Sequence, residues 1–260
     1  MSKTKVETFH RVATINSVIA ISLFTCGLAS TFAHAELPFE NGASGSTISE
    51  NGVLNSDLNS ALAEGIELDV GVTPELHALQ QRWAKVNYTM TGDEQITAFT
   101  SLVSRANELV LSEPKNAGYW AWLGICQSTS AAAIGGTDAL SLAKKAKASF
   151  EKSLKLDGDA LEGVATFSLG TLYHKVPGWP LSFGSDKEAK KLLSKAVERH
   201  PFSIDTNFFF GEFLFNDGDS EDAKAYLLRA KQAPPRADRP IADKYRRIAI
   251  DELLVKIAKD

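Results

Sequence analysis

Histidine and cysteine, the residue types that most often carry catalysis or hold a metal, are scarce in this chain of 260 residues. Beyond residue 35 only His77, His174 and His200 remain, without the i, i+4 spacing that places two imidazoles on one face of a helix. Neither a nucleophile elbow nor a phosphate-binding loop accompanies them. We therefore predict no catalytic residue, no metal site and no cofactor. Each histidine is expected to be a polar surface or helix-end residue.

Cys126 is the one thiol beyond residue 35, so that part of the chain cannot form an internal disulfide. It follows Trp122, Leu123 and Ile125 at helical spacing, which favours a small buried hydrophobic side chain over a nucleophile. An enzyme acting through His174 would lack any accompanying base, nucleophile or metal ligands. The protein is therefore predicted not to be an enzyme.

The overall charge argues against one broad class of partner. The chain has 28 lysine and arginine residues against 32 aspartate and glutamate residues, a net charge of −4, and removal of residues 1–35 makes it more acidic. A protein of this sign has no general attraction for phosphate backbones or anionic lipid. We therefore expect no nucleic acid partner.

Three segments repeat one pattern, in which a glycine is followed by an alanine and, four residues later, by a larger apolar residue. The glycine and alanine pairs are Gly124 and Ala146, Gly170 and Ala189, and Gly211 and Ala223. Small residues at these places allow two helices to cross closely, which is typical of tetratricopeptide repeats. Three such hairpins are also about the number at which a solenoid buries its core.

The repeats predict an all-α fold, a tetratricopeptide-like solenoid of helical hairpins. A degenerate first hairpin is expected to begin at Thr73, with Pro74 at the first helical position, which brings the total to about four. A last helix from Pro240 to Lys256 is expected to cap the open end of the stack, with its charged residues in solvent. Those residues are Lys244, Arg246, Arg247 and Asp251, opposite an apolar side of Ile241, Tyr245, Ile248, Leu253, Val255 and Ile257.

The first helices of the hairpins are expected to line a concave inner face, as in tetratricopeptide arrays. The residues predicted to form this ligand or partner groove are Ile125, Phe167, Thr171, His174, Trp179, Phe208, Glu212 and Phe215. So apolar a face favours a small apolar ligand, a hydrophobic segment or a partner helix over a peptide's terminal carboxylate. The alternative is that loops or end helices fill the face and that these residues form core.

Two hairpins carry inserted residues between their helices. The glycine-to-alanine spacing is 22 in the first, 19 in the second and 12 in the third, and an uninterrupted repeat has about 12. Gly135 and Gly136 are predicted to mark the first turn. The second insertion, residues 176–186, contains Trp179 between two prolines, and Phe183 three residues after the second. Trp179 is expected either to pack on its own protein, closing one side of the groove, or to contact a ligand or partner.

The amino-terminal sequence predicts export. Basic residues precede an apolar run at 18–28, and Ala33, His34 and Ala35 then form the small-x-small pattern of a signal peptidase site. We predict a signal peptide at 1–35, cleaved between Ala35 and Glu36, and a periplasmic protein. An uncleaved membrane anchor and a lipoprotein acylated at Cys26 are the alternatives. Residues 36–72 are predicted to form a flexible leader before a helical domain at 73–260.

Three stretches also resemble a known family. Residues 172–184 (LYHKVPGWPLSFG), 204–214 (IDTNFFFGEFL) and 233–243 (APPRADRPIAD) are similar to exported bacterial tetratricopeptide proteins related to the TRAP-transporter-associated tetratricopeptide component. The resemblance spans about Thr73 to the C terminus. It implies a periplasmic helical array with a hydrophobic-ligand cleft or pore, which associates with itself and with a periplasmic solute-binding protein of a secondary transporter.

Two functions follow from these patterns. The first is a periplasmic tetratricopeptide-repeat scaffold that mediates protein–protein interaction with a partner in the cell envelope. The second is an accessory protein that binds a small apolar ligand for a TRAP-type solute transport system, since Phe167, Phe208 and Phe215 are expected on the inner face. A homo-oligomer is compatible with both.

Overall fold

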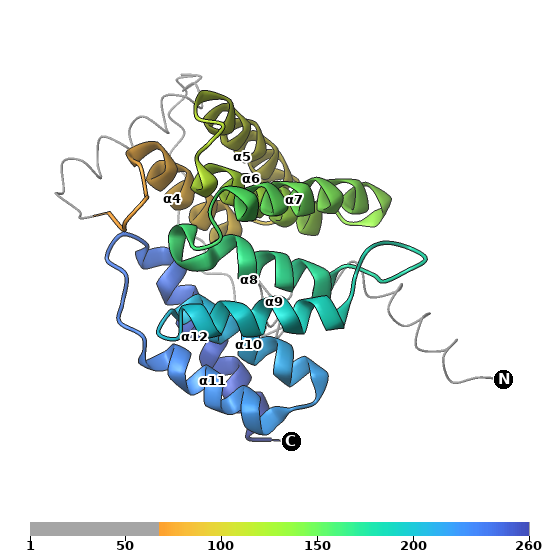
Figure 1. Cartoon of the computed structure of the whole chain (residues 1–260), viewed down its shortest axis with the longest axis vertical. Coiled ribbons are helices and arrows are strands. Elements are labelled where there is room, and N and C mark those ends of the chain that lie inside the picture. Colours follow the sequence, from red (N-terminus) through yellow and green to blue (C-terminus); the bar gives the residue numbers. More distant parts are fainter. Residues whose placement is uncertain (1–67, 260) are drawn as a thin grey trace, which may run out of the picture.

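The computed structural model describes residues 68–259, and helices dominate this part of the chain (Figure 1). The described helices are α4 (Pro74–Thr89), α5 (Gly92–Ser112), α6 (Ala117–Ile134), α7 (Gly136–Leu156), α8 (Ala160–Lys175), α9 (Asp186–Arg199), α10 (Ile204–Asp217), α11 (Ser220–Gln232) and α12 (Pro240–Ile257). The predicted all-α class is confirmed for the described residues.

Helix ends follow local sequence signals. The Thr73 hydroxyl accepts the backbone N–H of Leu76 at 3.2 Å and Pro74 occupies the first helical position, so α4 begins where the sequence predicted. Gly218 ends α10 in the left-handed conformation with φ 91°, and the Asp219 carboxylate then caps α11. Residues Leu161–Gly163 at the start of α8 also have positive φ, so its regular right-handed part begins at Val164.

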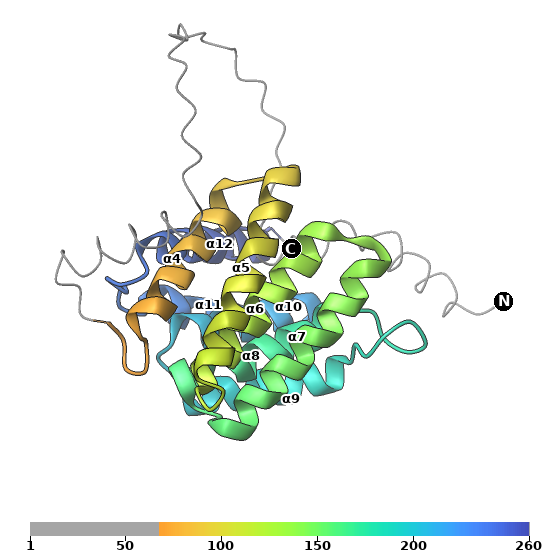
Figure 2. The ribbon, with the colours of Figure 1, turned by 90° about the horizontal axis from the view of Figure 1, so that it is seen from above.

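Consecutive helices pack as pairs, and the first helices of the pairs form a layer of their own. Helices α4, α6, α8 and α10 contact one another in that order, while α5, α7, α9 and α11 pack on their outer side (Figure 2). The described domain is thus consistent with an array of helical hairpins.

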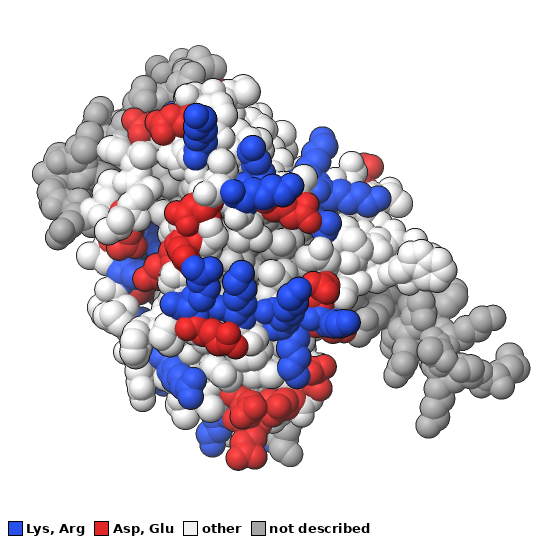
Figure 3. All heavy atoms as spheres, viewed as in Figure 1, with Lys and Arg blue, Asp and Glu red and all other residues white. Residues whose placement is uncertain are grey.

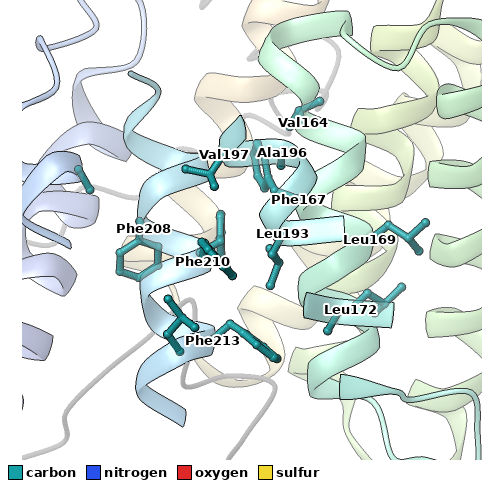
Figure 4. Packing of buried hydrophobic residues seen from close by; sticks show 14 of the residues in the cluster. Val164, Phe167, Leu169, Leu172, Leu193, Ala196, Val197, Phe208, Phe210 and Phe213 are labelled. Carbon is teal, nitrogen blue, oxygen red and sulfur yellow. The ribbon is translucent and has the colours of Figure 1, made fainter. Parts of the chain in front are cut away.

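The three predicted glycine crossings are present. A Cβ atom at Gly124 would lie 2.6 Å from the Phe150 ring, one at Gly170 would lie 2.8 Å from Leu193, and one at Gly211 would lie 3.0 Å from Leu227. These apolar partners are at most 1% exposed. Figure 4 shows buried side chains of α8, α9 and α10 directed toward one another, with Leu193 among them. Glycine therefore sets the close approach of the two helices in each of these hairpins.

The two insertions take different forms. The first turn lies at Gly135 and Gly136, with φ 68° and 65°, as predicted, and the added residues lengthen α6 and α7. The second insertion leaves the helices as a loop of residues 176–185, seen at the right of Figure 1.

The prediction that the last helix caps the open end with its charged side in solvent is right only in part: Lys244 and Asp251 are exposed, but Arg246 is buried. Helix α12 contacts α11 and α10 and reaches α4, so it crosses the inner layer. Arg246 is only 7% exposed, whereas Ile248 and Val255, assigned to the apolar side, are 43% and 53% exposed. The reason is that Arg246 has ionic and aromatic partners on α10 that outweigh its usual preference for water.

The amino-terminal predictions lie outside the described residues. These are the signal peptide at 1–35, its cleavage at Ala35 and Glu36, the acylation of Cys26 and the leader up to residue 67. No helix in the described range 68–259 is long and apolar enough to cross a membrane.

Candidate functional site

The inner layer lines a partly open pocket of about 120 Å³ beneath α12, which we call the inner chamber. Helices α4, α6, α8 and α10 provide its walls, and α12 with the segment before it provides its cover. Its apolar lining consists of Trp83, Ala84, Tyr88, Trp122, Ile125, Val164, Phe167, Leu172, Phe209 and Ala242. The partial covering by α12 thus turns a concave face into a chamber.

Aromatic rings make most of the chamber wall rigid. The Trp83 ring lies edge-on to that of Trp122, with centroids 5.6 Å apart, and its Nε1 donates to the Thr129 hydroxyl at 3.2 Å. Across the chamber Phe167 of α8 stacks on Phe209 of α10 at 5.1 Å. Edge-on and stacked pairs of this kind hold the rings in place, so the cavity is largely preformed.

An ionic network fixes α12 over the chamber. Asp205, at the start of α10, accepts hydrogen bonds from Arg236 at 2.7 Å and from Arg246 at 2.8 Å. Arg236 also donates its Nε and backbone N–H to Asp243 of α12, at 2.6 and 2.9 Å. The Arg246 guanidinium lies 4.2 Å from the Phe208 ring centroid. Its neighbours thus supply both a carboxylate and an aromatic face.

Electrostatics keeps the buried network ionised. Burial alone would raise the pKa of Asp205, but the guanidinium groups of Arg236 and Arg246 outweigh it and hold that pKa below its usual range. Burial likewise lowers the pKa of Arg236, and Asp205 with Asp243 more than compensates. The cover of the chamber is therefore held by charges that persist over the ordinary pH range.

A second cavity of about 630 Å³, the outer cavity, adjoins the chamber. The two share Gln80, Trp122, Val164 and Arg239. Gln80 is 3% exposed, and its Oε1 has no hydrogen-bond partner among the described residues; the same is true of the Arg239 Nε. The shared boundary thus carries one acceptor without a hydrogen bond and one donor whose nearest partner, the Asp238 carboxylate, lies 3.8 Å away as an ion pair.

Three residues of the predicted groove line the inner chamber: Ile125, Phe167 and Thr171. Phe208 lies behind the wall, 1% exposed, and supports Arg246. Phe215 packs against the hydrophobic core. The structure therefore brings part of the predicted groove to one cavity and assigns the rest to packing.

The polar members of the predicted groove connect helices. Glu212 is 7% exposed and lies 3.5 Å from the ammonium of Lys175, which itself lines the chamber. His174 makes a 2.8 Å contact from Nδ1 to Asp186 at the start of α9 and a 3.4 Å contact from Nε2 to Asn216 of α10. Both residues thus connect α8 with the helices packed beside it.

Trp179 lines neither cavity, and its side chain is 90% exposed. The expectation that it packs on its own protein is therefore wrong, because the loop directs it into solvent. His77 also departs from expectation, since it is 2% exposed and burial lowers its pKa. Cys126 is fully buried, as predicted, and burial raises its pKa. No group of histidine, cysteine or acidic residues in the described range could hold a metal ion.

Sequence reasoning missed the aromatic residues of α4 and the arginines of the cover. The repeat pattern does not include Trp83, and the pairing of its helix with α12 joins segments that are far apart in the sequence. A signal was present nonetheless, because Asp205 belongs to one of the three family-like stretches and Arg236, Arg239 and Asp243 belong to another. The structure joins those two stretches through the ionic network.

Comparison of the chain with protein-family models gave no match, and comparison with curated proteins gave none either.

Proposed function

We propose that the domain binds a small, largely apolar ligand in the inner chamber, and that it does so as a tetratricopeptide-like array. The observation that carries the proposal is the partial covering of the aromatic concave face by α12, which leaves a pocket of about 120 Å³. An apolar cavity of about 150 Å³ suffices for a ligand of the size of benzene. The inner chamber is somewhat smaller than that, so a short alkyl segment is the apolar group best suited to it.

The boundary with the outer cavity favours an amphipathic ligand. The apolar part would lie among Trp83, Trp122 and Phe167, and the polar part would meet the unsatisfied groups of Gln80 and Arg239. A hydroxyl or a primary amide both donates and accepts, so it would satisfy both groups. Leaving the buried Gln80 Oε1 without a hydrogen bond costs about 1–3 kcal/mol, which such a ligand would recover.

The broader roles expected from the sequence are part of this proposal. An accessory of a TRAP-type transport system, exported to the periplasm, would use the chamber for its solute. The scaffold hypothesis remains a separate prediction, and α12 leaves less of the inner face for a partner chain than an open groove would. A protein partner would then engage the outer helices.

Titration with 1-octanol, which combines a hydroxyl with an apolar chain, tests the proposal. We expect saturable binding by native mass spectrometry and a ligand-dependent rise in melting temperature. Ser168→Phe fills the chamber and should weaken binding about tenfold or more, whereas Ser141→Phe adds the same ring on an exposed site of α7. Equal binding by both variants, or none by the wild type, would count against a ligand chamber.

A further inference from the structure

The loop between α8 and α9 presents large apolar side chains to solvent. Trp179 is 90% exposed and Leu181 is 48% exposed, with exposed Pro180 between them. We call residues 179–181 the Trp179 tip. The loop projects from the body of the domain in both ribbon views (Figures 1 and 2). The tip is therefore displayed rather than packed.

The neck of the loop is fixed, so this display is part of the fold. The backbone N–H of Gly184 donates to the carbonyl of Pro177, and that of Ser185 to the carbonyl of Tyr173, both at 2.9 Å. A Cβ at Gly184 would lie 1.8 Å from the Val176 carbonyl oxygen, so the two strands of the neck can approach only with glycine there. The Phe183 ring also lies edge-on to Tyr173 at 5.6 Å.

Basic residues are concentrated on the two helices beside the loop. Helices α7 and α9 together contain ten basic and five acidic residues, although the chain as a whole has a net charge of −4. Figure 3 shows the lysine and arginine side chains in rows over these helices. Those classed as exposed are Lys144, Lys145, Lys152, Lys155, Lys187, Lys190, Lys191, Lys195 and Arg199.

Much of this positive charge is available for another molecule. Of the ten bases, three have a carboxylate within 4.0 Å in the described part of the chain: Lys147, Lys190 and Arg199. The acidic residues of the same helices are Asp138, Glu151, Asp186, Glu188 and Glu198, and Asp186 is engaged by His174. The two helices therefore carry a net excess of five positive charges.

The neck of the loop lies between the two basic helices. The Lys147 ammonium of α7 lies 5.6 Å from the centroid of the Phe183 ring in the neck, so α7 adjoins the loop. On the other side the loop leads directly into α9, whose first turns contain Lys187, Lys190 and Lys191. An apolar projection is thus flanked by cations on both sides.

We propose that the Trp179 tip and the basic faces of α7 and α9 bind an anionic phospholipid surface. The amphipathic indole prefers the boundary between water and hydrocarbon. Lysines near an anionic surface add attraction that depends on ionic strength. A stable protein interface buries about 800 Å² on each partner, but a tryptophan buries only about 150–250 Å². The apolar area of the tip is thus too small for a stable protein interface, but it is enough for insertion into lipid.

The charge of α7 and α9 is opposite in sign to the net charge of the chain, from which no attraction to anionic lipid was expected. The acidic overall balance argued against attraction to anionic lipid, because it treated the charge as evenly spread. The fold instead gathers positive charge on α7 and α9, the two helices that adjoin the loop of the exposed Trp179. Local charge, rather than the sum over the chain, governs attraction within a Debye length of about 10 Å at 0.1 M salt.

Vesicles with brominated acyl chains provide the test, using the whole chain. Bromine quenches an indole that enters the bilayer. Trp83 and Trp122 are only 6% and 4% exposed and Trp120 is half-buried, so the quenching that is lost in Trp179→Phe reports on Trp179. We expect quenching with vesicles of 70% phosphatidylcholine and 30% phosphatidylglycerol, and much less with pure phosphatidylcholine. Raising the salt from about 0.1 M to about 1 M should release the protein, because the Debye length falls to about 3 Å.

Matched variants separate the tip from nonspecific attachment. Trp179→Ala should weaken vesicle binding about tenfold or more in cosedimentation, since the inserted apolar area is lost. Phe202→Ala removes an aromatic residue that is 86% exposed beyond the other end of α9 and should leave binding unchanged. The double variant Lys190→Gln/Lys191→Gln should reduce binding to anionic vesicles only. Absence of quenching, equal binding to both vesicle types, or a Trp179-dependent complex with a protein in place of lipid would overturn the proposal.

Discussion

The hairpin crossings and the attachment of α12 hold helices together by different physical means. In each crossing a glycine lets an apolar side chain approach the opposing helix, as Gly124 does for Phe150. The attachment of α12 instead uses charges that would be costly to bury alone, as Asp205 does for Arg236 and Arg246. The first kind of joint depends on shape and the second on ionisation. The inner chamber needs both, because the hairpins form its walls and α12 forms its cover.

Removal of the central carboxylate should have the largest effect. Asp205→Ala would leave two guanidinium groups buried, with side-chain exposures of 13% and 8%, and without their shared partner. We expect a loss of about 3–5 kcal/mol in the free energy of unfolding, measured by urea titration. Asp159→Ala is the control, since Asp159 pairs with the half-exposed Arg199 and should cost about 1 kcal/mol or less. Similar losses for the two variants would show that the network does not hold the cover.

The glycine crossings can also be tested through the free energy of unfolding. Gly124→Ala places a methyl group against the Phe150 ring and should cost about 1–3 kcal/mol by overpacking. Gly211→Ala should cost less, since its nearest contact is 3.0 Å from one carbon of Leu227. Combining Gly124→Ala with Phe150→Leu should recover part of the loss. If Gly211→Ala lost more unfolding free energy than Gly124→Ala, close packing would not be the reason for glycine at these positions.

Acid should weaken the ionic joint and leave the crossings unaffected. The pKa of Asp205 is lowered in the folded protein, so its contribution is present above the unfolded value of about 3.9 and is lost as the pH falls below it. Asp238 acts in the opposite sense, because burial raises its pKa. We expect the unfolding free energy of the wild type to fall by at least about 1 kcal/mol more than that of Asp205→Asn between about pH 5 and pH 2. Parallel pH profiles would contradict the assignment.

The difference between the joints also explains what the sequence could predict. The glycine and alanine of each repeat lie close together in the sequence. The hairpins and the close crossing at Gly170 could therefore be predicted from the sequence. The position of α12 depends on partners that are distant in sequence, with Asp205 and Arg246 separated by 41 positions. On its own helix Arg246 resembles any solvated arginine. The chamber was therefore predicted as an inner face, but its cover and the aromatic contribution of α4 were not.

The Trp179 tip belongs to neither kind of joint, and stability measurements can show this. Trp179→Ala should change the free energy of unfolding by about 0.5 kcal/mol or less, because the side chain is 90% exposed. Phe183→Ala, by contrast, removes the ring that packs on Tyr173 beneath Lys147 and should cost about 1–3 kcal/mol. A loss of about 2 kcal/mol or more for Trp179→Ala would mean that the indole packs against the domain in solution, and the tip could then not reach a lipid surface. A small loss for Trp179 beside a large one for Phe183 would establish a rigid neck that presents a free aromatic tip.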